Sequence, residues 1–165
     1  MNYIFSAIFL YFFLGFLLYI FQRRIVFNKS GHPGAPKDYN LDNTEEVYIK
    51  TEDNLKLLSW YHKGNNSLPL LVYFHGNSFH IGDRAYRIQR YIEKNWSVLL
   101  VSWRGFGGNE GNPTEKNLYK DAEAVLKWIK NNTEFKFKEL VVYGESLGSG
   151  AVSYTHLTLP TSFLV

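Results

Sequence analysis

The residues with the clearest chemical meaning are Gly144-Glu145-Ser146-Leu147-Gly148. A serine hydroxyl can attack a carbonyl carbon when a sharp turn from a strand into a helix exposes it, and that turn needs small residues two before and two after the serine. The turn would also leave the backbone N–H of Leu147 at a helix start, directed at a developing oxyanion. The alternative is a Gly/Ser-rich loop without a catalytic role. The apolar run just before Gly144 favours the catalytic turn.

Three continuous apolar runs predict strands that are buried on both faces, as in a parallel sheet. They are residues 70–74, 98–101 and 140–143. Two earlier β-prone runs, 47–50 and 55–61, flank Glu52-Asp53-Asn54 and predict a hairpin.

Two segments between these runs have helical periodicity. Asp83 is expected to cap a helix that buries Ile88, Tyr91 and Ile92 and ends near Asn95. Thr114 is expected to cap a second helix, whose apolar face is Leu118, Ala122, Val125, Leu126 and Ile129. Alternating strands and helices predict an α/β fold with a mostly parallel sheet covered by helices. A length of 165 residues favours one domain.

Other polar residues at strand ends are expected to serve the structure. His75 precedes the serine and is predicted to be a packed, hydrogen-bonded side chain, and Asp121 a structural hydrogen-bonding group within its helix. The glycine-rich loop of residues 103–111 misses the G-x-G-x-x-G spacing, because Glu110 stands at the last glycine position. Nucleotide binding is therefore not expected, and the loop is predicted to shape the rim of the site.

Four motifs together resemble one family. HGN after the first buried strand, WRGFGGNEG after the next, NLYKDAEAVLKWI, and YGESLGSG stand in the order found in membrane-anchored α/β hydrolases of the serine aminopeptidase-like group. Asn109 and Ser78-Phe79-His80 depart from the residues usual there. The resemblance covers roughly residues 1 to 151. It implies a Ser–Asp–His triad with Ser146 as nucleophile, oxyanion N–H donors at Asn77 and Leu147, and an ester, thioester or amide substrate with an acyl chain.

The triad acid and base of this fold follow the nucleophile along the chain. After Ser146 the sequence has no Asp or Glu, and its only histidine, His156, comes too early to be the base. Without a base the serine is a poor nucleophile, so this chain is expected to be nearly inert. Residues 152–165 are rich in threonine and include Pro160, so we expect them to interrupt the helix after the serine. They resemble a translated sequencing adapter and are predicted to be a non-native tail, which makes the chain a C-terminally truncated fragment.

The N-terminus predicts a membrane anchor. Residues 4–21 carry no charge, and 18 residues suffice to cross a hydrocarbon core that needs roughly 17–25. The long run and the absence of a basic start favour an anchor over a cleaved signal peptide. Arg23, Arg24, Lys29 and Lys37 all follow the span, which places the globular part in the cytoplasm. The expected organisation is an anchor at 1–24, a linker at 25–44, a partial α/β-hydrolase domain at 45–151 and the tail.

Composition narrows the function classes. The net charge of +3 comes from scattered basic residues, which does not indicate nucleic-acid binding. The absence of cysteine excludes disulfides and thiolate metal sites, and we expect no cofactor or metal. The sequence therefore predicts a serine hydrolase acting on a small-molecule or lipid-like acyl substrate in the full-length parent. A non-catalytic membrane-anchored binding protein with this fold, or an acyltransferase using the same serine, are the alternatives.

Overall fold

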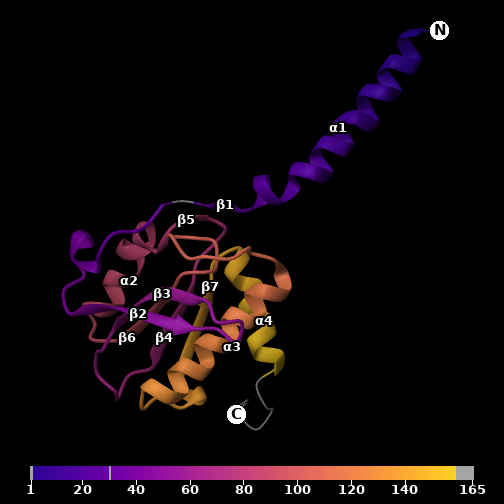
Figure 1. The fold of residues 1–165 in the computed structure, drawn as a ribbon. Helices are drawn as coiled ribbons and strands as arrows, with labels where there is room; N and C mark the ends of the chain where they lie inside the picture. The colour runs from indigo at the N-terminus through magenta and orange to yellow at the C-terminus, as the bar shows by residue number, and fades with distance from the viewer. Residues whose placement is uncertain (1, 30, 159–165) are drawn as a thin grey trace.

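A long N-terminal helix projects from a compact domain. The computed structural model describes residues 2–29 and 31–158, and its first element is helix α1, Asn2–Val26. Figure 1 shows α1 extending from one edge of the domain into open space. Its segment Tyr3–Gln22 has a mean hydropathy of 2.4 and none of it is buried. The apolar helix predicted over residues 4–21 is confirmed, and its length and composition would allow it to cross a bilayer.

The domain is built on a five-stranded mixed sheet. Its strands are β2 (Thr44–Lys50), β3 (Lys56–His62), β4 (Leu70–Phe74), β6 (Ser97–Val101) and β7 (Leu140–Gly144), in the order β2-β3-β6-β4-β7. The pairs β2–β3 and β3–β6 are antiparallel, whereas β6–β4 and β4–β7 are parallel. The predicted hairpin and the parallel pairing are therefore confirmed, and β4 and β6 are buried along their whole length. The predicted burial of β7 on both faces is wrong, because β7 lies at the edge of the described sheet and leaves Val141 and Tyr143 exposed. Because β4 and β7 run parallel, their carboxyl ends meet at one edge of the sheet.

Helices cover both faces of the sheet. Helices α3 (Glu115–Asn132) and α4 (Leu147–Thr158) pack on the face that carries Val72, Phe74 and Leu99. Helix α2 (Ala85–Ile92) and the 3-10 turn η1 (Pro36–Tyr39) pack on the other face. Successive residues of β4 and β6 alternate between the two cores, as the two-residue period of a strand requires. A further 3-10 turn, η3 (Phe137–Glu139), leads into β7.

Capping of the two middle helices differs. The Thr114 side chain accepts from the Asn117 N–H at 3.2 Å, so the predicted cap of α3 is confirmed. The prediction for Asp83 is wrong, because this residue lies inside the 3-10 turn η2 (Ile81–Arg84) and α2 begins at Ala85. Its carboxylate accepts from the His80 N–H at 3.2 Å, so it stabilises the start of η2. The helix buries Ile88 as expected, whereas Tyr91 and Ile92 are only half-buried, and it ends at Ile92, before the predicted end near Asn95.

Helix α4 corrects the expectation for the tail. It continues through residues 152–158 and ends at Thr158, whereas the sequence predicted an interruption there. The Tyr154 ring stacks on Tyr119 of α3 with 4.1 Å between centroids, and its hydroxyl donates to Glu123 at 2.6 Å. Packing against α3 thus outweighs the low helix propensity of this segment. Residues 159–165 of the predicted non-native tail lie outside the described residues.

The linker between helix and sheet packs onto the domain. Strand β1 (Asn28–Lys29) pairs in parallel with β5 (Ser78–Phe79), which follows the carboxyl end of β4. The Phe27 ring packs edge-on against Phe106 with 6.5 Å between centroids, and Leu41 is buried in the core. The end of α1 is therefore connected to the edge of the sheet where β4 ends.

Candidate active site

Ser146 lies on a sharp turn between β7 and α4. Its φ angle is +50°, a left-handed conformation that non-glycine residues rarely adopt. The Gly148 N–H donates to the Glu145 carbonyl and the Ser149 N–H to the Ser146 carbonyl, each at 2.9 Å. The serine is exposed, so the turn presents its hydroxyl to solvent at the carboxyl edge of the sheet.

The two glycines of the motif are required by close backbone approaches. A Cβ on Gly144 would lie 2.5 Å from the Gly148 carbonyl oxygen, and a Cβ on Gly148 would collide with the Phe74 carbonyl oxygen. These contacts pack the start of α4 against the turn and against β4. The mechanical reason proposed for the G-x-S-x-G spacing is therefore present in the structure.

The loop after β4 lies against this turn. A Cβ on Gly76 would be 3.5 Å from the Ser146 Cβ and 3.4 Å from the Glu145 carbonyl oxygen. Asn77 follows directly, and its side-chain Nδ2 donates to the carbonyl of Val26 at 2.6 Å. Leu147 is the first residue of α4, where backbone N–H groups have no acceptor within the helix. The roles of Asn77 and Leu147 as oxyanion donors stay predictions.

A charged cluster that the sequence did not predict supports the turn. The Glu145 carboxylate accepts from the Tyr73 hydroxyl at 2.7 Å and from Arg84 Nη2 at 3.0 Å, and Arg87 Nη1 lies 3.8 Å away. Burial alone would raise the pKa of Glu145, but the bonds from Arg84 and Tyr73 outweigh it and lower that pKa below its ordinary value. The carboxylate thus stays ionised and ties β4, η2 and α2 to the residue before Ser146.

His75 is fully buried and hydrogen-bonded, as predicted. Its Nε2 accepts from the Trp103 N–H at 3.4 Å, which leaves Nδ1 as the donor to the Gly76 carbonyl at 2.6 Å. Burial, aided by the charge of Arg84, lowers the pKa of His75 to about 4, so the ring is neutral at pH 7. The neutral, buried ring of His75 therefore has a structural role.

The glycine-rich loop after β6 is held by a buried ion-pair network. Arg104 is almost fully buried and donates to Asp121 Oδ1 at 2.6 Å and to Asp53 Oδ2 at 2.7 Å. Asp121 also accepts from the Arg104 backbone N–H at 3.1 Å, which confirms its structural role. Asn109 accepts from the Leu58 N–H at 2.9 Å and so connects the loop to β3.

A further histidine and possible metal ligands are also present in the sequence. His156 lies in α4, and its side chain is outside the part that the structure describes. Within residues 2–29 and 31–158, no three His, Cys, Asp or Glu side chains gather so as to hold a metal ion.

Known proteins are similar to this chain in sequence and in fold. No protein-family model matches the chain. Protein bem46 of Schizosaccharomyces pombe is 32% identical over 151 residues, which cover 85% of this chain and 49% of that protein. The lysophosphatidylserine lipase ABHD12 of Danio rerio is 28% identical over 142 residues, 72% of this chain and 36% of the lipase. The chain spans about half the length of the first curated relatives it matches.

A solved structure has a similar fold. The esterase Pf2001 of Pyrococcus furiosus superposes with a TM-score of 0.62 at 30% identity, over 75% of this chain and 50% of the esterase. The fold predicted from the sequence, a partial α/β-hydrolase fold behind one apolar helix, is confirmed by this match together with the mixed sheet.

Proposed function

Since this chain belongs to the α/β hydrolases and is related to bem46 and ABHD12, we propose that it is the N-terminal part of a serine hydrolase with Ser146 as its nucleophile. Ser146 attacks the carbonyl carbon of an ester, thioester or amide, the bond to the alcohol, thiol or amine breaks, and that group leaves with the proton of the serine hydroxyl. Water then hydrolyses the acyl-enzyme to the free acid and restores the serine. The observation that carries this proposal is the φ of +50° at Ser146, since strained non-glycine residues cluster at active sites.

The N–H groups of Asn77 and Leu147 are proposed to bind the developing oxyanion. Gly76 contacts the turn, so the loop that carries Asn77 lies beside the serine, and Leu147 provides the first N–H of α4. Donors of this kind stabilise charge that forms in the transition state and typically contribute a factor of about 10² to 10³ in kcat. The acid and base of the triad are proposed to come from residues of a longer protein, because no Asp or Glu follows Ser146 here.

The test begins with the gene. Amplification from source DNA and sequencing past codon 151 should give a longer reading frame that contains an Asp and then a His. In that protein, Ser146→Ala should lower the hydrolysis of acyl esters by a factor of at least about 10³ and abolish labelling by a fluorophosphonate probe. Ser67→Ala changes an exposed serine in the loop before β4 and is the matched control. Equal activity of the two variants would rule out Ser146 as nucleophile.

The acceptor of the acyl group separates hydrolase from acyltransferase. With a long-chain alcohol present, a hydrolase releases mainly free acid, whereas an acyltransferase forms mainly the new ester. We propose water as the acceptor. Dominant ester formation would assign the acyltransferase reaction to the same serine.

Helix α1 is proposed to span the membrane once, with the domain in the cytoplasm. The chain contains no cysteine, so Lys130→Cys introduces a single reactive site at the end of α3. A membrane-impermeant maleimide should label this site only after the cells are opened. Labelling in intact cells would reverse the proposed orientation.

A further inference from the structure

The end of the apolar helix and the loop beside Ser146 form one connected unit. The Asn77 side chain donates to the Val26 carbonyl at 2.6 Å, and Lys29 pairs with Phe79 in the β1–β5 ladder. Phe27 packs against Phe106 of the glycine-rich loop. Three independent contacts therefore keep the domain from swinging freely about the end of α1. The loop after β4 is therefore fixed in position relative to the end of α1.

The length of α1 sets the depth of this unit. The 20 residues Tyr3–Gln22 rise about 30 Å as a helix, which equals the thickness of a bilayer's hydrocarbon core. The remaining turn to Val26 adds roughly 6 Å, about the depth of one headgroup layer. Phe79 pairs with a residue three positions beyond Val26, at most about 10 Å of extended chain. The helix end and Phe79 are then both within reach of the membrane surface.

Phe79 has two energetically unfavourable features. The residue is 55% exposed, and its φ angle is +62°, a conformation that glycine or asparagine adopts more readily. Figure 1 shows β1 and β5 together at the edge of the domain nearest α1. An aromatic ring at the boundary of a bilayer instead leaves water for a partly apolar layer. Contact with lipid would therefore offset the cost of exposing this large apolar side chain.

We propose that Phe79 and the loop around it rest on the bilayer surface, so that the Ser146 site opens at the membrane and takes its acyl substrate from the lipid layer. The Phe79 contact rests on the proposed membrane span of α1, and the substrate class rests on the proposed function of Ser146. The occupant of this surface is the phospholipid bilayer that holds α1.

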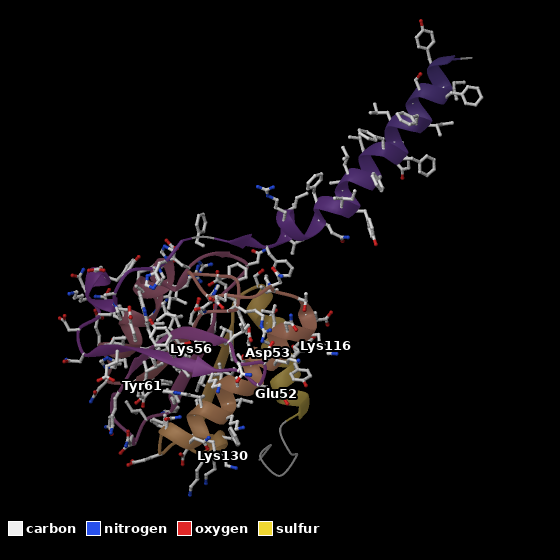
Figure 2. The ribbon with its side chains drawn as sticks, viewed as in Figure 1. Glu52, Asp53, Lys56, Tyr61, Lys116 and Lys130 are labelled. Atoms are coloured by element: carbon white, nitrogen blue, oxygen red, sulfur yellow. The ribbon has the colours of Figure 1, made fainter. Side chains whose placement is uncertain are left out.

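The test measures the depth of residue 79. Because the chain lacks cysteine, Phe79→Cys can carry a single environment-sensitive nitrobenzoxadiazole label in the full chain, reconstituted in phosphatidylcholine vesicles. Lys130→Cys is the control, since Figure 2 shows Lys130 at the end of the domain far from α1. His80→Cys provides a second label position beside Phe79 if the first variant does not fold.

The label at 79 should emit at shorter wavelength than the label at 130. A spin-labelled lipid quencher should quench it at least about twofold more strongly. Equal quenching at both positions would overturn the membrane contact. This readout needs no turnover, so it is independent of whether Ser146 is a nucleophile.

The proposal that the acyl substrate comes from the lipid layer is tested separately, in the longer protein. Phe79→Ser should raise KM for an ester carried in vesicles and leave KM for a short soluble ester unchanged. An equal change in KM for both substrates would overturn delivery of the substrate from the membrane. The activity of Ser146→Ala tests the nucleophile separately and does not affect the measured depth of residue 79.

Discussion

Arg84 Nη2 lies 3.0 Å from Glu145 Oε1, and this ion pair joins the start of α2 to the residue that precedes Ser146. The Arg84 side chain is only 8% exposed and that of Glu145 21%. The Tyr73 hydroxyl completes the arrangement from β4. Since Gly76 also contacts Glu145, the pair holds the loop of Asn77 and the turn of Ser146 in one geometry. Glu145 is thus a positioning residue for the candidate site.

Glu145→Gln should lower the free energy of unfolding by about 1–3 kcal/mol, because it removes a charged acceptor from buried donors. The measurement is a urea titration followed by tryptophan fluorescence in detergent micelles. Glu93→Gln changes an exposed residue just after α2 and should stay within about 0.5 kcal/mol of the parent. Equal effects of the two variants would contradict a positioning role.

The free energy of unfolding should depend on pH in two ranges, one set by His75 and one by Glu145. The pKa of His75 is lowered to about 4 from an ordinary 6.5, so the folded state resists its protonation. Above pH 6.5 the ring is neutral in both the folded and the unfolded state. Between pH 6.5 and 4 only the unfolded state takes up the proton, so the free energy of unfolding falls by about 3 kcal/mol. The lowered pKa of Glu145 means that its contribution is present above about pH 4.5 and is lost as the pH falls below that value. Urea midpoints from pH 7.5 to 3.5 measure both.

Two variants separate these ranges. His75→Gln should flatten the curve between pH 6.5 and 4, although it lowers stability overall. Glu145→Gln should leave that part and flatten the curve below pH 4.5. A His75→Gln curve parallel to that of the parent would show that the ring titrates normally.

Local signals in the sequence predicted the strands and the serine turn, since both depend on neighbouring residues. The three apolar runs became β4, β6 and β7, although β7 is not buried, and the spacing of Gly144 and Gly148 reflects contacts within one turn. The pair Arg84–Glu145 joins residues 61 positions apart, and Asn77–Val26 joins residues 51 positions apart. No local pattern encodes such pairings. Helix α4 continued past residue 151 for the same reason, because Tyr154 finds its partners on α3.

The buried network of Arg104 should be strongly asymmetric. Asp121 is fully buried, so Asp121→Ala leaves a buried guanidinium poorly compensated and should cost about 3–5 kcal/mol. Asp53 is 37% exposed, and water can replace it, so Asp53→Ala should cost at most about 1 kcal/mol. Urea midpoints of the two variants give the comparison. A larger loss for Asp53→Ala would mean that the outer carboxylate holds the loop.

Two glycines of α4 should respond to the same substitution with opposite signs. A Cβ on Gly148 would collide with the carbonyl of Phe74, so Gly148→Ala must push α4 away from β4 and should cost about 1–3 kcal/mol. Gly150 has nothing within 4 Å of such a Cβ, and Gly150→Ala should stabilise the helix by about 0.5–1 kcal/mol. Thermal melts followed by circular dichroism distinguish them. Because the displaced helix begins at Leu147, Gly148→Ala in the longer protein should also lower kcat, and Gly150→Ala should not. Two variants that both stabilise would mean that the close approach of Gly148 to β4 is not needed for the turn of Ser146.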